Sequence, residues 1–511
     1  MCRKHQFCEL AGVILLALLL SWSSSAWSEH EHGDAHPISE GDSIGEIDFG
    51  VNCEEGVRAD FDRALGLMHH MMYVQARAAF GEIIEADPDC AMAYWGVATT
   101  LFQPLWGTRP SEEDIQHGVR MIEQARDRVA SDREAKLLET TAAFFREPDT
   151  ADFGTRITRW IESMEGAYQA YPDDPDIASL YALSRLTLAQ RVEDRGKLHD
   201  EAESVLRAVY EEIPTHPGAI HYSIHATDAD GRAENALDMV EAYGKIAPEV
   251  PHALHMPSHI HVRRGDWPAV IDWNRRSADA ALRQPVNDAV SHHYVHAIDY
   301  LVYAYLQQGE VDKAEAAFEE AREMDRHQPT FVSAFHFAAI PARLAVEQRD
   351  WERAAALEPR TPGYLPWDAS PWAEGLTWYA RGLGAVHTGD LEAARDAEQR
   401  LATLRDGAKA DGAGSMATYI EVDRRILAGR LAHARGDDED AVALMESAAE
   451  LEGTVEKHPV TPGALLPPYE ALGDLLADLG RPADAREAYE ASNAIWPGRR
   501  NTLEGVEMAG R

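Results

Sequence analysis

The chain has 511 residues, of which 45% are hydrophobic and 26% charged, and its formal net charge is −39. This hydrophobic content is enough for a continuous core, which excludes an intrinsically disordered chain. The excess of acidic residues repels nucleic acid and anionic membranes, so neither is an expected partner.

Residues 1–26 are predicted to be a secretory signal peptide. Arg3 and Lys4 precede an apolar run over residues 11–20, and small residues at 24–26 fit a cleavage site. No later stretch reaches the ~20 apolar residues of a membrane helix, so the mature chain is not expected to insert into a membrane. The expected localisation is periplasmic or secreted. Residues 27–50, which are acidic and rich in histidine, are predicted to be a disordered tail.

Residues 51–500 carry a recurring helix-turn-helix pattern. The last copy matches the tetratricopeptide repeat (TPR) of about 34 residues. Its matching positions are Tyr469, Leu472, Gly473, Gly480, Ala485, Tyr489 and Pro497. The turn residue of the pattern recurs at Gly231, Gly265, Gly309, Gly389 and Gly436, with a degenerate copy at Asp350. The pattern predicts an all-α fold, a TPR-like right-handed superhelical solenoid forming one repeat domain.

Two stretches depart from this frame. Between residues 111 and 214 the pattern is faint, so this part is predicted to be helical without an assigned register. Residues 501–511 follow the last copy and are predicted to be a C-terminal tail.

Two cysteines remain in the predicted mature chain. Cys53 precedes the first predicted helix hairpin and Cys90 follows it, so both lie at its open end. An even number of cysteines in an oxidising compartment favours a Cys53–Cys90 disulfide over two free thiols.

Nine of the 23 histidines lie between residues 217 and 303. In the TPR frame most of them occupy positions of the first helix of a repeat that face the concave groove, as is typical of the repeat family. His221/His225 and His255/His259 are spaced i, i+4, which puts both imidazoles of a pair on one helix face. Neighbouring helix axes lie ~8–10 Å apart, so these side chains can converge on one ion or two. The predicted metal ligands are His221, His225, His255, His259, His296 and Asp299, and further groove residues are His252, Asp228, Tyr303 and His336.

A single histidine pair is usually structural, and here the recurrence of pairs at equivalent positions favours a metal site. His261 occupies a packing position and is predicted to be structural. His292 and His293 precede the expected helix start, where they would cap the helix or support a ligand. Pro257 is expected to kink its helix or delay the start, which would put His252 and His255 in a loop.

Two other segments have metal-like composition. The tail segment at residues 29–36 contains three histidines, but a disordered acidic tail is the favoured interpretation. The run at residues 68–72, Met-His-His-Met-Met, suggests a soft copper site, but its methionines fall at an apolar turn and core packing is favoured.

Several motifs resemble those of bacterial secreted tetratricopeptide-repeat-like proteins. They are His69–Phe80 with Tyr94–Gly96, His252–His259 and His458–Pro462, and the resemblance covers nearly the whole mature chain. It implies a repeat superhelix and carries no reaction with it.

Three functions fit the histidine groove. The first is binding of a divalent transition metal (zinc, iron, copper or nickel), alone or as a bridge to a small-molecule ligand. The second is a metal-dependent enzyme, which needs an acid or base such as Asp299 or Asp228. Tyr222 and Met256 stand where a His-Glu-x-x-His hydrolase carries its glutamate, which argues against that class. The third is a metal-free scaffold that binds a peptide or protein. The sequence does not decide whether the chain is an enzyme.

Overall fold

The computed structural model describes residues 42–106, 109–192 and 194–510. Regular secondary structure in these ranges is entirely helical, and the only strand-like pairing is at two isolated bridges near residues 286–290 and 327. The all-α, TPR-like solenoid predicted from the repeat pattern is therefore confirmed. The predicted signal peptide and the histidine-rich segment at residues 29–36 lie outside the described residues.

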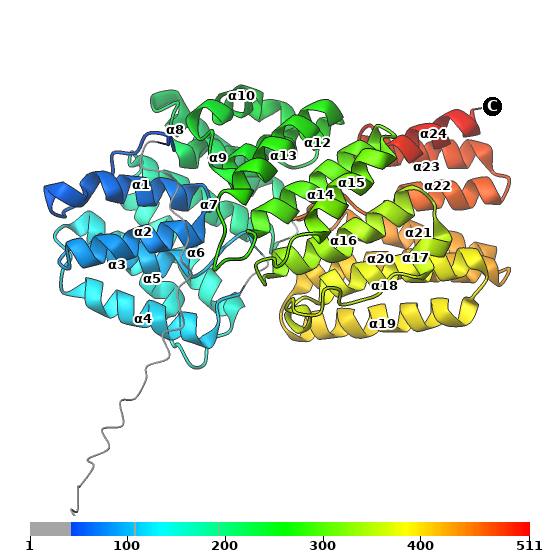
Figure 1. The fold of residues 1–511 in the computed structure, drawn as a ribbon, viewed down its shortest axis with the longest axis horizontal. Helices are drawn as coiled ribbons and strands as arrows, with labels where there is room; N and C mark the ends of the chain where they lie inside the picture. The colour runs from blue at the N-terminus through cyan, green and yellow to red at the C-terminus, as the bar shows by residue number, and fades with distance from the viewer. Residues whose placement is uncertain (1–41, 107–108, 193, 511) are drawn as a thin grey trace, which may run out of the picture. The chain divides into compact units, whose positions relative to one another are not determined.

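Each helix packs against the next along the chain, which builds the stack of hairpins in Figure 1. The first helices are α1 (Arg58–His69), α2 (Tyr73–Ala86), α3 (Ala91–Thr100), α4 (Glu112–Arg126), α5 (Asp132–Phe145), α6 (Phe153–Ala170), α7 (Pro175–Ala189) and α8 (Gly196–Glu212). The central helices are α9 (Pro217–Thr227), α10 (Leu237–Ile246), α11 (Pro251–His255), α12 (Pro257–Arg264), α13 (Trp267–Leu282), α14 (His292–Gln307), α15 (Val311–Arg322), α16 (Phe331–Glu347) and α17 (Trp351–Ala355). The last helices are α18 (Pro371–Thr388), α19 (Leu391–Ala410), α20 (Gly414–Ala434), α21 (Asp438–Glu452), α22 (Pro468–Asp478), α23 (Pro482–Ile495) and α24 (Arg500–Ala509). Short 3-10 turns are η1 (Glu55–Val57), η2 (Ala233–Ala236) and η3 (Trp367–Ala369).

Several of the turns between paired helices contain a left-handed residue. Gly309 ends α14 with φ 73°, and the amide of Glu310 donates to the Tyr305 carbonyl at 2.8 Å, closing the helix end. The degenerate repeat makes the same turn without glycine, because Arg349 adopts φ 57° and the Asp350 amide donates to the Ala345 carbonyl at 2.9 Å. A side chain in this region costs roughly 1–2 kcal/mol, so the turn persists because the packing around it requires it.

The faint stretch between residues 111 and 214 continues the same architecture. Helices α4 to α8 contact one another in order, and α8 packs against α9. Their caps explain where they begin: Ser111 accepts from the Asp114 amide and Asp174 accepts from the Ile177 amide. The stretch therefore supplies further hairpins, although its sequence lacks the turn glycines.

The two ends of the predicted repeat domain need correction. Residues 44–50, predicted as part of a disordered tail, pack on the first hairpins: Ile44 and Phe49 are buried, and the Phe49 ring lies 5.1 Å from that of Phe61. Residues 501–511, predicted as a tail, instead contribute most of α24, which buries Thr502. Each segment packs on the hairpin at its end of the solenoid. Residues 44–50 cover an apolar surface of the first hairpin, and α24 covers a polar surface of the last one, which would otherwise be exposed.

A disulfide joins Cys53 and Cys90, whose Cα atoms are 4.7 Å apart. It connects Cys53, two residues before η1, with Cys90, the N-cap of α3, so it closes the open end of the first hairpin.

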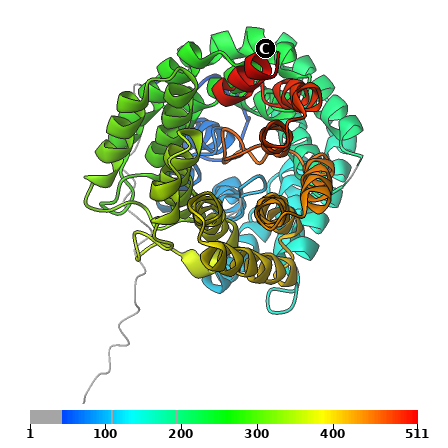
Figure 2. The same cartoon turned by 90° about the vertical axis from the view of Figure 1, so that its right-hand side faces the viewer.

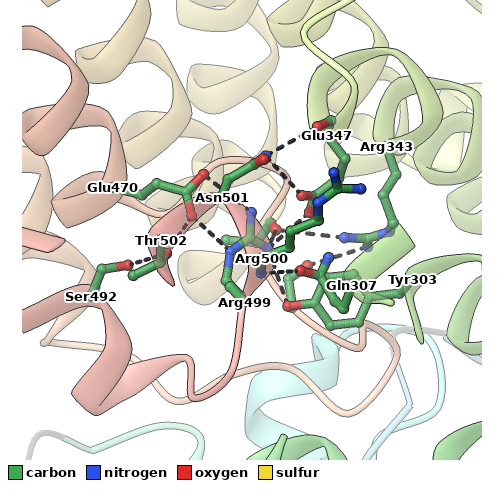
Figure 3. A network of polar contacts seen from close by, with 12 residues as sticks. Tyr303, Gln307, Arg343, Glu347, Glu470, Ser492, Arg499, Arg500, Asn501 and Thr502 are labelled. Atoms are coloured by element: carbon green, nitrogen blue, oxygen red, sulfur yellow. Dashed lines mark hydrogen bonds and ion pairs between the residues drawn. The ribbon is translucent and has the colours of Figure 1, made fainter. Parts of the chain in front are cut away.

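The C-terminal hairpins return to the middle of the chain, where α24 contacts α14. Figure 3 shows the polar network at this contact. Arg499 is 1% exposed, and it donates to Glu470 at 2.9 Å and to the Tyr303 hydroxyl at 3.1 Å, with Glu347 at 2.9 Å. Arg499 also donates to the Ala464 carbonyl at 3.5 Å, in the connector that spans residues 453–467 before α22.

The connector between α21 and α22 runs along the inside of the coil of helices, as Figure 2 shows. Lys457 donates to Asp228 at 2.8 Å, and Tyr300 donates to the carbonyls of Pro459 and Thr461 at 3.2 and 3.1 Å. The groove beside α9, α12 and α14 is therefore covered by this connector. No helix in the described ranges is long and apolar enough to cross a membrane.

Candidate metal centre

Six histidines from α9, α11, α12 and α14 form two groups of three in the interior. We call His221, His225 and His252 the first triad, and His255, His259 and His296 the second triad. In each triad, one ring nitrogen per histidine lies within 4.8 Å of those of the other two. All six side chains are buried, and none is more than 8% exposed.

The helices place these rings as the i, i+4 spacing predicts. His221 and His225 lie one turn apart on α9, with ring centroids 5.0 Å apart, and the centroids of His255 and His259 are 4.8 Å apart. Pro257 does interrupt the helix, but α11 ends only at His255 and Met256 keeps a helical conformation. His252 and His255 therefore lie on a helix rather than in a loop.

In the second triad, hydrogen bonds fix which nitrogen carries the proton on two of the rings. His255 Nδ1 is 2.7 Å from the Asn274 amide oxygen, and Asn274 is oriented because its own amide nitrogen donates to the Val270 carbonyl at 2.7 Å. His259 Nδ1 is 2.8 Å from an oxygen of Asp228. Both acceptors lack a proton, so each Nδ1 donates and each Nε2 carries a lone pair.

The two Nε2 atoms of His255 and His259 face each other at 3.0 Å. With both protons on Nδ1, this contact is between two lone pairs and is repulsive. A cation shared by the two nitrogens makes the arrangement favourable.

The third ring of the second triad is oriented through another histidine. His336 Nδ1 donates to Asp299 at 3.1 Å, so its Nε2 accepts a hydrogen bond from His296 Nδ1 at 2.8 Å. The lone pair of His296 is then on Nε2. Asn274, Asp228 and the His336–Asp299 pair thus select one tautomer for all three rings of this triad.

The first triad has nitrogens without partners. His221 Nδ1 donates to the His69 carbonyl at 2.6 Å, which leaves the lone pair on Nε2. That Nε2, the Nε2 of His225 and both nitrogens of His252 are buried and have no hydrogen-bond partner among the described residues. Buried polar atoms normally have a partner, so these four nitrogens are free to bind a ligand.

The triads are adjacent. The ring of His225 lies 5.8 Å from that of His259, and the ring of His252 lies 5.9 Å from that of His255 and 6.4 Å from that of His296. The six imidazoles therefore form one contiguous buried cluster of rings, which we call the histidine pocket.

The imidazoles are neutral at physiological pH. Burial, together with repulsion from neighbouring histidines, holds the pKa of His221, His252, His255 and His296 well below 6.5. Burial also lowers the pKa of His225 to about 3. A neutral imidazole is the form that binds a metal ion, so no proton has to leave first.

Two buried carboxylates support the triads without joining them. Burial opposes the ionisation of Asp228, but Lys457 and Arg263 hold its pKa well below the usual range. Arg263 donates to Asp228 at 2.8 Å, and Arg343 donates to Asp299 at 3.0 Å. Both carboxylates are thus ionised and already paired with cations.

The structure places the remaining predicted residues as follows. Asp299 supports His336 instead of reaching the triads, and Tyr303 is turned to the Arg499 network in Figure 3. His261 contacts Asp266 at 3.2 Å, outside the cluster. His292 and His293 belong to α14 itself, which begins one residue after its cap Ser291, and do not precede the helix.

The Met68–Met72 segment is part of the core. All three of its methionines are buried. His70 bonds the Tyr243 hydroxyl at 2.8 Å and the Ile44 carbonyl at 2.9 Å, and His69 lies 3.0 Å from Asp176. These histidines have partners, as a structural role requires.

The sequence predicted His252 as a further groove residue rather than as a metal ligand, and it did not predict Trp106 or Asn274 as part of the site. His252 completes the first triad. The Trp106 ring packs 5.3 Å from His252 and 5.9 Å from His296, and it covers the pocket from a loop after α3. The repeated groove position of His252 was a usable signal, whereas nothing local marks Trp106 or Asn274.

The chain thus has a helical-repeat fold of the TPR type, and the geometry of its buried histidine groups could hold a metal ion. Residues 301–328, in α14 and α15, match the family model described as tetratricopeptide repeat. No curated protein matches the chain.

Three solved structures are similar over most of the chain. The APC/C hetero-tetramer Cut9-Hcn1 is 11% identical, covers 91% of this chain and 78% of its own, and has a TM-score of 0.41. A human IFIT1 dimer with m7Gppp-AAAA is 11% identical, covers 82% and 90%, and scores 0.40. Yeast Tom70 is 10% identical, covers 88% of both chains and scores 0.33. These scores are low, and no property of the three proteins is transferred to this chain.

Proposed function

We propose that this protein binds a divalent transition metal ion in the second triad. The observation that supports the proposal is the 3.0 Å approach of the Nε2 atoms of His255 and His259, both of which carry lone pairs. Two ligands at metal–nitrogen distances of about 2.0–2.1 Å and a tetrahedral angle lie about 3.3 Å apart, close to this spacing. His296 supplies the third imidazole, and zinc, iron, copper and nickel all accept such a donor set.

Three imidazoles leave a coordination position open to a small-molecule ligand. The same property would serve a metal-dependent enzyme, since catalytic ions keep an open position.

Elemental analysis of the purified full chain tests the proposal. After supplementation with zinc, iron, copper or nickel and removal of free ion, we expect at least one bound ion per chain. The double variant His255→Ala/His259→Ala should lose the ion of the second triad while keeping its helicity, because the solenoid core is built from other positions.

The matched control replaces two other buried histidines by alanine. His199 and His327 each bond a backbone carbonyl at 2.8 Å and lie outside both triads. The control variant should retain its metal. A His255→Ala/His259→Ala variant with the same metal content as this control would show that the second triad is not the site.

A metal-free scaffold for a peptide or protein is the second candidate. The tetratricopeptide repeat at residues 301–328 favours it, as does a cavity of about 420 Å³ lined by Trp106, Arg191, Tyr419 and His458, among others. Wild-type protein that holds no metal after supplementation would favour this function over the first. The net charge of −39 argues against nucleic acid as the partner.

We also propose that the protein is periplasmic or secreted. The Cys53–Cys90 disulfide supports this location, because structural disulfides persist in oxidising compartments. N-terminal sequencing of the protein recovered after cell fractionation is expected to begin at Trp27. Recovery in the cytoplasm with an intact start would refute the proposal.

A further inference from the structure

The first triad repeats the features of the second at a neighbouring place. It too combines an i, i+4 pair, His221 and His225, with one histidine from the next hairpin, His252. The shift from one triad to the other is one repeat along the solenoid, which explains why two similar sites stand side by side.

The first triad is not explained as packing. Elsewhere in the described core, His69, His70, His199 and His327 all have a hydrogen-bonding or charged partner for at least one ring nitrogen. His252 has none for either nitrogen, although it is only 2% exposed. Leaving such groups buried and unpaired destabilises the fold, so a bound cation would remove an energetic penalty.

The two triads are close enough to form one centre. Their nearest rings, His225 with His259 and His252 with His255, lie 5.8 and 5.9 Å apart. Ions coordinated by these rings would occupy the same pocket, as in two-metal sites, where the ions are commonly ~3.5–4 Å apart.

The charge balance of the two triads indicates that bound metal ions would need an anion beside them. Six neutral imidazoles bring no negative charge, and Asp228 and Asp299 are already paired with Lys457, Arg263 and Arg343. Two divalent ions would therefore leave about four uncompensated positive charges in a buried pocket, which is strongly unfavourable without an anion. A cavity of about 30 Å³ adjoins His225, the one triad histidine that lines it. Its charged lining residues are Asp228, Glu456 and Lys457, and it has room for a ligand of about the size of a water molecule.

We propose that the two triads hold two transition-metal ions in one dinuclear centre that also binds a small anion, such as hydroxide. This proposal rests on the proposed function, because it adds a second ion beside the ion of the second triad. The open position left by three imidazoles at each ion is where the anion binds.

Stoichiometry separates the two proposals. The full chain is loaded with Cu²⁺, passed through a desalting column and analysed for copper. His30, His32 and His36 are replaced by serine in every sample, because this segment can bind copper on its own. Two ions per chain are expected. One ion would overturn the dinuclear centre and leave the proposed function standing, and no ion would overturn both.

Single variants assign the ions to their triads. His252→Gln should reduce the copper content from two ions to one, and His296→Gln should also remove at least one. His327→Gln is the control, since His327 is equally buried and lies outside the triads, and it should keep two ions. A His252→Gln variant that keeps two ions would contradict the assignment of the first triad.

Electron paramagnetic resonance shows whether the ions are neighbours. Two Cu²⁺ ions in one pocket should give a magnetically coupled spectrum, which His252→Gln converts into that of an isolated ion. Two bound ions with only isolated-ion signals would refute the single centre.

Azide is the probe for the anion. Titration of the copper-loaded chain should reach saturation at one azide per two copper ions, with a charge-transfer absorption that His252→Gln weakens. Absence of any azide-dependent absorption would refute the anion site.

Discussion

Replacement of Arg499 by methionine should open the C-terminal hairpin. The Arg499 side chain is 1% exposed and is the nearest cation to Glu347, which is 2.9 Å away and itself only 4% exposed. It also donates to Glu470, whose side chain is fully buried. Methionine fills a similar volume but removes the guanidinium from both carboxylates, and Glu470 keeps only Arg349, at 3.8 Å, as a cation among the described residues. Removing one partner of such a buried pair costs about 3–5 kcal/mol.

Hydrogen exchange of α24 peptides measures this cost locally. A loss of about 3 kcal/mol in opening free energy accelerates exchange by about 10²-fold, since each ~1.4 kcal/mol is a factor of ten. Arg500→Met is the matched control, because Arg500 is 47% exposed and pairs with the exposed Glu504, an interaction worth about 0–1 kcal/mol. Adding Glu347→Gln to Arg499→Met should recover part of the loss. Equal exchange in the Arg499→Met and Arg500→Met variants would refute the reasoning.

Three further predictions concern stability and metal affinity. Replacing Cys53 and Cys90 by serine should lower the free energy of unfolding of the first hairpins by about 3–4 kcal/mol, because the disulfide closes a loop with a sequence separation of 37. Urea unfolding measures this loss, and an unchanged midpoint would contradict the prediction. Burial lowers the pKa of His70 from 6.5 to about 4, so the unfolded chain takes up a proton that the folded chain does not. The free energy of unfolding is therefore highest above pH 6.5 and falls towards pH 4, by at most about 1.4 kcal/mol per pH unit for this residue. A urea midpoint that stays constant between pH 7 and 5 would contradict this prediction. Asp228→Asn should weaken metal binding by about 10–100-fold in a chelator competition, because the Asp228 carboxylate orients the His259 ring. The helicity of the variant should be unchanged. A variant with wild-type metal affinity would refute this supporting role of Asp228.

The repeat architecture could be predicted from the sequence because its signals are local. The turn glycine, the small residue that follows it and the helical periodicity act within one hairpin, so they mark the hairpins from α9 to α23 without knowledge of the neighbours, whereas α24 lies beyond the last copy and was missed. The same frame put His221, His225, His255, His259 and His296 on groove faces of successive helices. That was enough to predict that they converge, since successive hairpins stack.

Only the tertiary structure decided what surrounds these histidines. Lys457 lies 229 residues from Asp228, and the His69 carbonyl lies 152 residues from His221, yet both contacts fix the charge or tautomer of the pocket. Trp106 and the connector at residues 453–467 close a groove that the frame alone would leave open. Such contacts depend on the accumulated packing of many hairpins, and no periodicity within one repeat encodes them. For the same reason Asp299 and Tyr303, which were predicted at groove positions, contact Arg343 and Arg499, respectively, rather than the triads.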